Sequence, residues 1–527
     1  MNRRELLQLS VLGAASSAAG QEPKERPGVP PAFEWAGKSI KQLQAELKSK
    51  NLTSAQLTQA YVKRIETTNP LLHAVLEVSA EAVREAEALD RERQDKGARG
   101  PLHGIPVLVK DNIETGEKLQ TTAGSLALNG TPPKNDAFVV KKLRDAGAVI
   151  LGKANLSEWA NLRSLKSTSG WSARGGQSRN PYALDRSPTG SSSGSGIAIA
   201  ADLCTVALGT ETNGSIIMPA SVMGVVGLKP TVGLVSRTGV IPIAPSQDTI
   251  GPMGRSVEDV ATLLTALTGF DGEDLAMRGA GRKAEDDYTK GLERDGLKGK
   301  RLGVVRASFG AGTMHKKVMD GALRELERLG ATLVNVELPP IDGGLQLEVL
   351  LTEFKASLNE YLKKRRPDAA VKTLADVIAF NEKNTERELH FFGQDLLVAA
   401  EAKGPLTAPA YKKALDTIRK AARQGIDSVI AKNKLDAFVG GAAEPAWLID
   451  PVLGDSANVA FGGEHAAVAG YPSLTVPCGV VGGLPVGLLF FGAAYSEAAL
   501  LRLGFAYELA APAKVAPTYA ATATPKF

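Results

Sequence analysis

Three stretches of the sequence carry side chains that could do chemistry together. Lys110 follows the apolar run of residues 105–109, a loop rich in serine and glycine spans residues 190–196, and a polar turn spans residues 209–215. A serine hydroxyl is a poor nucleophile unless a base lies within hydrogen-bond reach. A lysine can be that base only when neutral, and burial can lower its pKa from about 10.4 by several units. Taken singly, a strand-ending lysine is usually solvated and a turn serine usually caps backbone groups, so the argument needs all three stretches.

The order and the amino-acid sequences of these stretches resemble those of the amidase signature family, serine hydrolases built on a Ser–cis-Ser–Lys triad. The matching motifs are GIPVLVKDN at residues 104–112, GSSSGSG at residues 190–196 and GTETNGS at residues 209–215. The resemblance covers nearly the whole chain beyond the N-terminus and looks closest to bacterial peptide amidases, on residues 169–177 and 230–252. It implies an α/β fold with a mixed, twisted central β-sheet covered by helices on both faces.

The resemblance assigns a role to each member of the triad. Ser215 matches the nucleophile, Ser191 the bridging serine and Lys110 the base. A hydroxyl both donates and accepts, so Ser191 can pass a proton from Ser215 to Lys110 and later to the leaving nitrogen. Asp111 would oppose loss of the lysine proton if it faced the ammonium group, so we expect it to point elsewhere.

The resemblance also implies two backbone features around the triad. The peptide bond between Gly190 and Ser191 is expected in the cis form. The backbone N–H groups expected to form an oxyanion hole belong to Thr212, Asn213 and Gly214. Many family members have two glycines before the nucleophile where this chain has Asn213 and Gly214. Asparagine tolerates left-handed backbone better than most residues, so the turn can be kept.

Two further departures from the family pattern bear on the substrate. Many members have an arginine two residues after the nucleophile, which in some grips a substrate carboxylate, and this chain has Ile217 there. We therefore expect Ile217 to form an apolar wall of the substrate pocket, and a carboxylate near the scissile bond to be disfavoured. Residues 440–444 stand where the family usually has a Pro-Thr turn and are expected to border the pocket.

Strand and helix patterns alternate along the chain. Short apolar runs at residues 105–109 and 148–151 are typical of buried strands, and a helical pattern lies between them at residues 137–146. This alternation predicts an α/β protein. We expect one amidase domain over residues 37–527, with a helix-rich insertion at about 345–435 that roofs the substrate cleft.

The N-terminus has the pattern of a targeting signal. Residues 1–20 contain Arg3 and Arg4, then a short apolar stretch and small residues, which predicts a secretory signal peptide. The apolar part is shorter than the roughly 20 residues that span a bilayer, and the paired arginines indicate the twin-arginine route. A linker is expected at residues 21–36. We expect export to the periplasm or beyond, by Tat or Sec, with no membrane attachment after signal removal; a frayed amphipathic terminus is the alternative.

Composition and motif checks exclude several other function classes. Lys plus Arg number 62 against 57 for Asp plus Glu, and no basic run interleaves with aromatics, so no nucleic-acid partner is expected. Cys204 and Cys478 make neither a disulfide framework nor a zinc site. Residues 147–153 resemble the start of a phosphate loop, but Ala154 supplies no hydroxyl for magnesium, and a strand is the better interpretation. No metal, cofactor or obligate protein partner is expected.

The resulting hypothesis is an exported serine amidase that forms an acyl-enzyme on Ser215. C-terminal peptide amides are the preferred substrate class, with aryl or alkyl amides second. The rivals are the glutaminase subunit of an aminoacyl-tRNA amidotransferase and an amidase-like binding or scaffold protein. Residues 190–194 also fit the nucleophile elbow of α/β-hydrolases, which would make Ser192 the nucleophile with a downstream histidine, one of His315, His390 and His465.

Overall fold

One mixed sheet of 11 strands runs through the part of the chain that the structure, a computed structural model, describes: residues 29–279, 283–456 and 460–523. Its strands, in spatial order, are β1 (Val75–Val78), β3 (Val149–Ala154), β2 (Pro106–Lys110), β6 (Val206–Glu211), β8 (Thr249–Gly254), β7 (Val226–Lys229), β12 (Ser473–Val481), β13 (Leu484–Phe491), β11 (Ala437–Gly441), β9 (Arg301–Val304) and β10 (Thr332–Asn335). Strand β2 is parallel to β3 and β6, strand β9 is parallel to β10 and β11, and the remaining neighbours are antiparallel. The predicted signal peptide at residues 1–20 lies outside the described residues.

The two strands expected from short apolar runs lie side by side in the sheet. Every residue of β2 and of β3 is buried, as in strands covered on both faces, which read as nearly continuous apolar sequence. Residues 149–153 of the phosphate-loop look-alike belong to β3, so the interpretation as a strand is confirmed.

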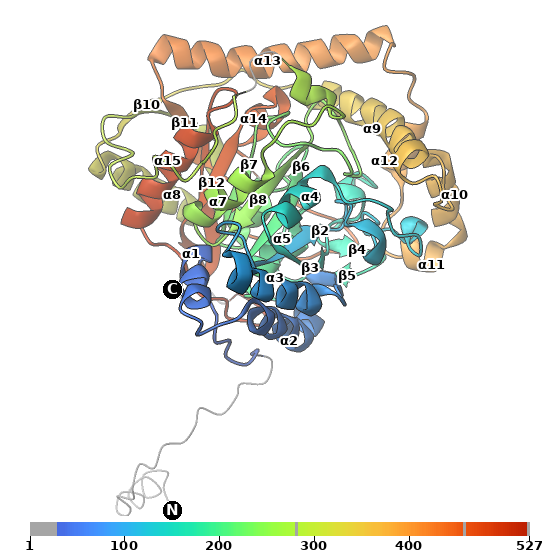
Figure 1. The fold of residues 1–527 in the computed structure, drawn as a ribbon. Coiled ribbons are helices and arrows are strands. Elements are labelled where there is room, and N and C mark those ends of the chain that lie inside the picture. Colours follow the sequence, from blue (N-terminus) through green and yellow to red (C-terminus); the bar gives the residue numbers. More distant parts are fainter. Residues whose placement is uncertain (1–28, 280–282, 457–459, 524–527) are drawn as a thin grey trace, which may run out of the picture.

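Helices flank the sheet, as predicted for an α/β protein (Figure 1). Those outside the expected insertion are α1 (Ile40–Lys48), α2 (Ser54–Leu72), α3 (Ala82–Lys96), α4 (Phe138–Asp145), α5 (Ser193–Ala200), α6 (Ile217–Val222), α7 (Val257–Leu267), α8 (Thr313–Arg328), α14 (Glu464–Ala469) and α15 (Glu497–Ala510). A two-stranded hairpin, β4 (Trp171–Ser172) with β5 (Gly176–Gln177), stands apart from the main sheet. Helix α2 begins with a capping box in which Thr53 and Gln56 exchange hydrogen bonds.

The segment expected to be a helix-rich insertion forms a layer along one side of the molecule. Its helices are α9 (Gly343–Arg365), α10 (Leu374–Lys383), α11 (Thr385–Glu388), α12 (Asp395–Glu401) and α13 (Pro409–Asn433). In Figure 1 they run along the top and right edges of the molecule, with the long α13 across the top. This layer has an apolar contact surface of its own, in which Phe354 of α9 packs edge-on against Trp159 with ring centroids 6.4 Å apart.

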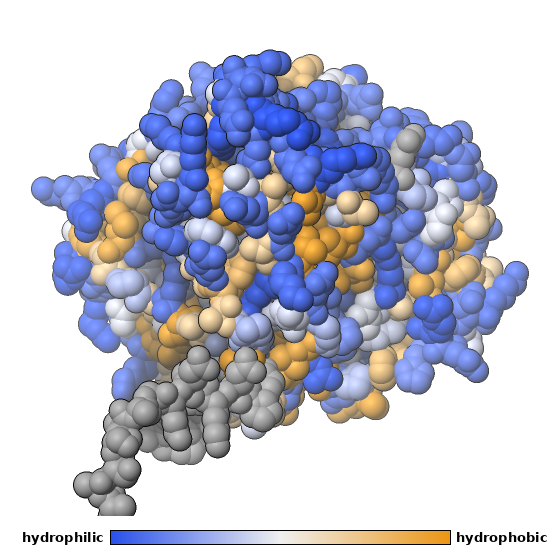
Figure 2. All heavy atoms as spheres, turned by 60° about the horizontal axis from the view of Figure 1, so that its bottom comes forward, coloured by the Kyte–Doolittle hydropathy of each residue, from blue (hydrophilic) through white to orange (hydrophobic). Residues whose placement is uncertain are grey.

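The surface of the molecule mixes polar residues with small apolar patches. Figure 2 shows the lower face of Figure 1 turned forward, where hydrophilic residues predominate around separate hydrophobic areas. Among the described residues, no helix is both long enough and apolar enough to cross a membrane.

Candidate active site

The parallel strands β2 and β6 bring the first two chemical stretches together. Val109 of β2 pairs with Leu208 of β6, so the end of β2 at Lys110 lies beside Thr210. The serine loop reaches the same place because Ser192 hydrogen-bonds to Thr210 in both directions: Ser192 Oγ donates to the Thr210 carbonyl at 3.1 Å and accepts from its N–H at 3.2 Å. The ends of two strands and the start of α5 therefore meet at one point.

Lys110 is fully buried among hydroxyl groups. Its Nζ lies 2.7 Å from Ser191 Oγ, 3.0 Å from Ser192 Oγ, 2.9 Å from Thr210 Oγ1 and 3.1 Å from the Thr210 carbonyl oxygen. Burial lowers the pKa of Lys110 to about 7, and the carboxylates of Glu211 and Asp248 only partly oppose this shift. A substantial fraction of this lysine is therefore neutral at neutral pH and can accept a proton from a hydroxyl.

The three hydroxyls around Lys110 are not equivalent. Ser192 Oγ donates its proton to the Thr210 carbonyl, and Thr210 Oγ1 already accepts from Asn112 Nδ2 at 3.0 Å. Within the described chain, the Ser191 hydroxyl has Lys110 Nζ as its hydrogen-bond partner. Of the three hydroxyls, that of Ser191 is the one with no second protein partner in the described chain, so it can exchange protons with the lysine and with a group in the cavity.

The backbone around Ser191 has the form that the resemblance implies. The peptide bond between Gly190 and Ser191 is cis. Residue 190 must be glycine here, because a Cβ at this position would lie 2.2 Å from Ser157 Oγ and 3.0 Å from Asn161 Oδ1. The Ser157 N–H also donates to the Ser191 carbonyl at 3.1 Å, which further fixes the loop.

The turn that carries Ser215 is fixed on both sides. Ser192 N–H donates to the Ser215 carbonyl at 3.1 Å, joining the serine loop to the turn. After the turn, Glu211 Oε2 accepts the N–H groups of Ile216 at 2.7 Å and Ile217 at 3.0 Å. Ser215 itself is only half-buried.

The backbone ahead of Ser215 leaves donors free. Gly214 has a φ of +86°, the left-handed conformation that glycine adopts without strain. Among the described residues, the N–H groups of Thr212, Asn213 and Gly214 have no protein acceptor. Thr212 Oγ1 instead anchors the turn by donating to Asp248 Oδ1 at 2.6 Å. Free N–H groups beside a serine are the arrangement that stabilises an oxyanion.

Asp111 points away from Lys110, as expected. Its Oδ1 lies 2.9 Å from Arg174 Nη1, and its Oδ2 accepts from the Thr122 hydroxyl. The carboxylate next to the lysine in sequence is therefore neutralised by an arginine and does not hold the lysine in its charged form.

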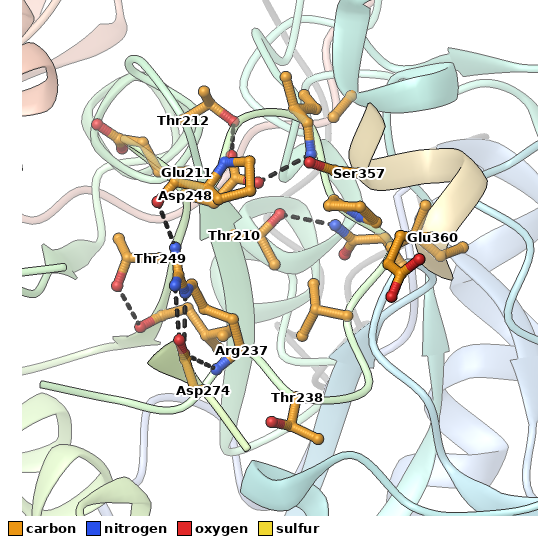
Figure 3. A pocket seen from close by; sticks show the side chains of 18 of the residues that line it. Thr210, Glu211, Thr212, Arg237, Thr238, Asp248, Thr249, Asp274, Ser357 and Glu360 are labelled. Atoms are coloured by element: carbon orange, nitrogen blue, oxygen red, sulfur yellow. Dashed lines mark hydrogen bonds and ion pairs between the residues drawn. The ribbon is translucent and has the colours of Figure 1, made fainter. Parts of the chain in front are cut away.

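Two cavities open at the site, and they share Ala160, Thr212 and Ile243. The Ser215 cavity has a volume of about 360 Å³; its other lining residues are Asn161, Leu162, Ser169, Gly190, Asn213, Ser215, Met218, Leu350, Trp447, Asp455, Ser456 and Phe461. The Ser191 cavity, seen in Figure 3, has a volume of about 330 Å³, and its wall includes Ser191, Thr210, Glu211, Asp248, Ser357 and Glu360. Helix α9 lines both cavities, through Leu350 in one and Ser357 and Glu360 in the other.

Sequence reasoning missed several residues of the Ser215 cavity. Trp159, Ala160 and Asn161 all have positive φ, between 48° and 73°, which turns the chain so that Ala160 and Asn161 face the cavity. Trp447 and Asp455 arrive from far along the chain; Asp455 accepts from Ser169 N–H at 3.0 Å and from Trp447 Nε1 at 3.2 Å. Three consecutive left-handed residues without glycine leave no local signal in the sequence.

The expected apolar wall at Ile217 needs correction. Ile217 is fully buried in an apolar cluster with Phe438 and Phe491, and the neighbouring Met218 lines the Ser215 cavity instead. Helix α6 begins at Ile217, so consecutive side chains there point in different directions. Residues 440–444 belong to β11 and the segment just after it, outside the linings of both cavities.

The residues of the α/β-hydrolase alternative are not assembled. Ser192 is fully buried and its hydroxyl is committed to Thr210. Of the histidines considered, His465 contacts the Pro339 carbonyl at 2.7 Å, His390 packs edge-on against Phe391, and His315 is buried near Glu444. The hydroxyls of Ser191, Ser192 and Thr210 contact Lys110 without a histidine among them, and within the described chain no hydrogen bond joins Ser215 Oγ to this group.

Comparison with known proteins identifies the family of this chain. The family model named Amidase matches residues 56–501. The chain is 44% identical over 496 residues to a probable amidase of Arabidopsis thaliana, covering 92% of each chain. It is 35% identical to a chloroplastic/mitochondrial glutamyl-tRNA(Gln) amidotransferase subunit of Zea mays, over 90% of this chain and 89% of that one. The solved peptide amidase of Stenotrophomonas maltophilia superposes with a TM-score of 0.89 at 49% identity, over 93% of this chain and all of that one. The chain belongs to the amidase family and is an amide-hydrolysing enzyme.

Proposed function

We propose that this amidase hydrolyses the C-terminal carboxamide of peptides through an acyl-enzyme on Ser215. The observation that carries the proposal is the buried Lys110, with its pKa lowered to about 7 and its Nζ 2.7 Å from the Ser191 hydroxyl. In this mechanism Ser215 Oγ attacks the carbonyl carbon while its proton passes to Ser191 and the Ser191 proton passes to Lys110. The N–H groups of residues 212–214 stabilise the oxyanion.

Collapse of the tetrahedral intermediate breaks the C–N bond. Lys110 returns its proton through Ser191 to the leaving nitrogen, which departs as ammonia. Water then enters, Ser191 and Lys110 accept its proton in turn, and the ester on Ser215 is hydrolysed to the free acid. No step uses a histidine or a metal ion.

The polar lining of the Ser215 cavity favours a peptide as the acyl part. Asn161 Oδ1 and Asn213 Oδ1 are buried without a hydrogen-bond donor, and both residues line this cavity. Such oxygens can accept the backbone N–H groups of a bound peptide, which an aryl or alkyl amide lacks. The relative named a peptide amidase has the same overall fold at 49% identity.

An apolar rim near the cavity supports the same substrate class. Four large side chains stand 54% to 76% exposed, and they belong to Leu165, Leu448, Val452 and Leu453. They lie close in sequence to residues that line the cavity: Leu165 is four residues before Ser169, Leu448 follows Trp447, and Val452 and Leu453 precede Asp455. A peptide that extends out of the cavity can bury apolar side chains against this rim.

The rival glutaminase function is disfavoured by charge. Among the described lining residues of the Ser215 cavity, Asp455 is the one ionisable side chain. A substrate with a free carboxylate, such as glutamine, would meet no basic partner there, and burying an unpaired charge is costly. The similarity to amidotransferase subunits is therefore best explained by shared family descent.

Ammonia release tests the proposed reaction. The protein would be incubated with a panel of amidated dipeptides, with free glutamine as the competing substrate. Turnover of peptide amides but not of glutamine, and its loss in Ser215→Ala and Lys110→Ala, is the expected result. Turnover of glutamine alone, or full activity in Ser215→Ala, would overturn the proposal.

We also propose that the chain is exported, on the basis of the signal-like residues 1–20. Expression in a bacterium that has both the Tat and Sec routes, followed by N-terminal sequencing of the protein outside the cytoplasm, tests this. Cleavage near residue 20 is expected. Retention in the cytoplasm of an Arg3→Lys, Arg4→Lys variant would assign the Tat route, and an unprocessed wild-type chain in the cytoplasm would contradict export.

A further inference from the structure

We propose that the Ser191 cavity binds the leaving group, and that it accepts amines carrying a second, positively charged amino group. The enzyme would then hydrolyse N-(aminoalkyl) amides as well as primary amides. This inference rests on the proposed function, because it uses Ser191 as the group that returns a proton to the leaving nitrogen.

The position of the cavity separates it from the acyl side of the site. Ser191 and Thr210, which both contact Lys110 Nζ, line this cavity, whereas Ser215 lines the other. The proton reaches the leaving nitrogen from Ser191, so the substituent on that nitrogen lies on the Ser191 side. The cavity of about 330 Å³ is several-fold larger than ammonia requires, since one water molecule occupies about 30 Å³ in the liquid.

Two buried oxygens in the cavity wall lack donors. Asn112 is 4% exposed; its Nδ2 donates to Thr210 Oγ1, and its Oδ1 has no partner. Glu211 is 1% exposed; its Oε2 holds the turn after Ser215, and its Oε1 has no partner. Buried acceptors without donors are costly, so this wall is complementary to a ligand rich in N–H groups.

The charges around the cavity favour a cation. The Arg237 guanidinium faces the cavity, but three of its hydrogen bonds, counting its backbone N–H, go to the carboxylate of Asp274. The carboxylates of Asp248, Glu273 and Glu360 also line the cavity. Glu360 forms an exposed ion pair with Lys364 at 2.5 Å. Asp248 accepts hydrogen bonds from the Thr212 hydroxyl and from two backbone N–H groups.

The sum of these groups is an acidic wall and mouth. With Arg237 neutralised by Asp274, the negative charge that remains inside comes from Glu211 and Asp248. The exposed Glu273 and Glu360 stand at the rim, where Lys364 offsets one of these two charges. Such a surface attracts an ammonium group and repels a carboxylate. The reaction balances as for primary amides: the acyl–Ser215 bond forms, the C–N bond breaks, the proton from Ser215 ends on the departing diamine, and water releases the acid.

Three nearly isosteric leaving groups on one peptide test the inference. The same dipeptide would be prepared as its N-(2-aminoethyl), N-propyl and N-carboxymethyl amide, with the primary amide as reference, and kcat/KM measured for each. We expect the aminoethyl amide to be hydrolysed about ten-fold faster than the propyl amide, and the carboxymethyl amide to be the slowest. Equal rates for aminoethyl and propyl amides, or no hydrolysis of either while the primary amide is cleaved, would overturn the inference and leave the proposed function intact.

A variant that removes two charges at the cavity rim provides a second test of the inference. In Glu273→Gln, Glu360→Gln the preference for aminoethyl over propyl should fall at least three-fold, and added salt should weaken it in the wild type because these groups are exposed. The matched control is Glu66→Gln on α2, which removes an exposed glutamate elsewhere and should keep the wild-type preference. An unchanged preference in the double variant would overturn the inference. If the wild-type protein hydrolyses none of these amides, the primary amide included, the proposed function itself is refuted.

Discussion

Two fully buried lysines at the ends of neighbouring parallel strands, Lys110 on β2 and Lys153 on β3, have opposite surroundings. Lys153 pairs in register with Val109, and side chains alternate along a strand, so the two lysines point to opposite faces of the sheet. Burial lowers the pKa of both, to about 7 for Lys110 and about 8 for Lys153. Desolvation alone therefore does not distinguish a base from a structural lysine.

The difference lies in what each amine contacts. Lys153 Nζ donates to the Ile113 carbonyl and to Thr115 and Thr121, and its neighbours include the carboxylates of Asp111, Glu77 and Glu114. Lys110 also contacts hydroxyls and one carbonyl, that of Thr210, but its hydroxyl partners include Ser191 and Thr210, which line a cavity. A buried lysine becomes useful as a base where a hydroxyl connects it to a bound substrate. A lysine held by a carbonyl and two threonine hydroxyls, with carboxylates nearby, stabilises the fold instead.

The largest expected effect on kcat/KM comes from removing the amine of Lys110, the lysine that contacts cavity-lining hydroxyls. Lys110→Met should lower kcat/KM for a peptide amide at least about 1,000-fold, because no other group in contact with Ser191 can accept its proton. The protein should remain folded, because the Thr210 carbonyl keeps Ser192 Oγ as a donor, Thr210 Oγ1 keeps Asn112 Nδ2, and methionine brings no buried amine to desolvate. Steady-state kinetics and circular dichroism of the variant measure both effects. Activity within ten-fold of wild type in a folded variant would contradict the role of the lysine.

The next effect separates the two adjacent serines that contact Lys110. Ser191→Ala should lower kcat/KM by about 100- to 1,000-fold, because it breaks the path between Ser215 and the lysine. Ser192→Ala should cost about ten-fold or less, because Ser192 gives its proton to the Thr210 carbonyl and only helps to position the site. Parallel kinetics on the two variants provide the test. A larger loss in Ser192→Ala than in Ser191→Ala would revive the nucleophile-elbow hypothesis.

The second lysine should matter for stability more than for rate. Lys153→Met leaves the Ile113 carbonyl and two threonine hydroxyls without their buried donor, so the free energy of unfolding should fall by about 2–4 kcal/mol. The activity of the folded fraction should stay within ten-fold of wild type. Urea titration and kinetics on the same preparation measure the two quantities. If Lys153→Met lost as much activity as Lys110→Met and kept its stability, the assignment of Lys153 as a structural lysine would be wrong.

The residues proposed as the triad can be picked out of the sequence because they lie inside long motifs. Lys110 ends an apolar run, Ser191 lies in a polar loop ahead of a buried segment, and Ser215 lies in a polar turn after one. The residue types and their order are therefore visible in the sequence alone. The fold class was visible for the same reason, since buried parallel strands read as continuous apolar stretches.

The walls of the cavities could not be read in this way. Asn161 reaches the Ser215 cavity through a left-handed turn that contains no glycine, and Asp455 meets Ser169 from 286 residues away. The choice between Ile217 and Met218 depends on the rotational phase of the first turn of α6, which one sequence does not reveal. Local motifs thus point to candidate reacting groups, whereas the residues that line the cavities depend on long-range packing.

The smallest expected effect is the pH dependence near neutrality, and it compares the two lysines directly. Lys110 acts when neutral, so kcat/KM should reach a plateau above its pKa of about 7, stand near half of that plateau at pH 7, and fall about ten-fold per pH unit below it. Lys153, with a pKa of about 8, should leave no inflection in this profile. Rates measured from pH 5 to 9 with a neutral peptide amide, in wild type and in Lys153→Met, test the assignment.

Stability should follow a different pH course from the rate. Both lysines have lower pKa values in the folded chain than the about 10.4 of an unfolded chain, so between the two values the unfolded state binds more protons. Each lysine should therefore add to the free energy of unfolding as the pH rises from its folded pKa to about 10. This gain should be lost as the pH falls from about 10 to the folded pKa. Lys153→Met should flatten this rise while the kinetic inflection near pH 7 stays in place. If the variant instead moves the kinetic inflection, the two lysines titrate as one unit and the opposite faces of the sheet are not independent.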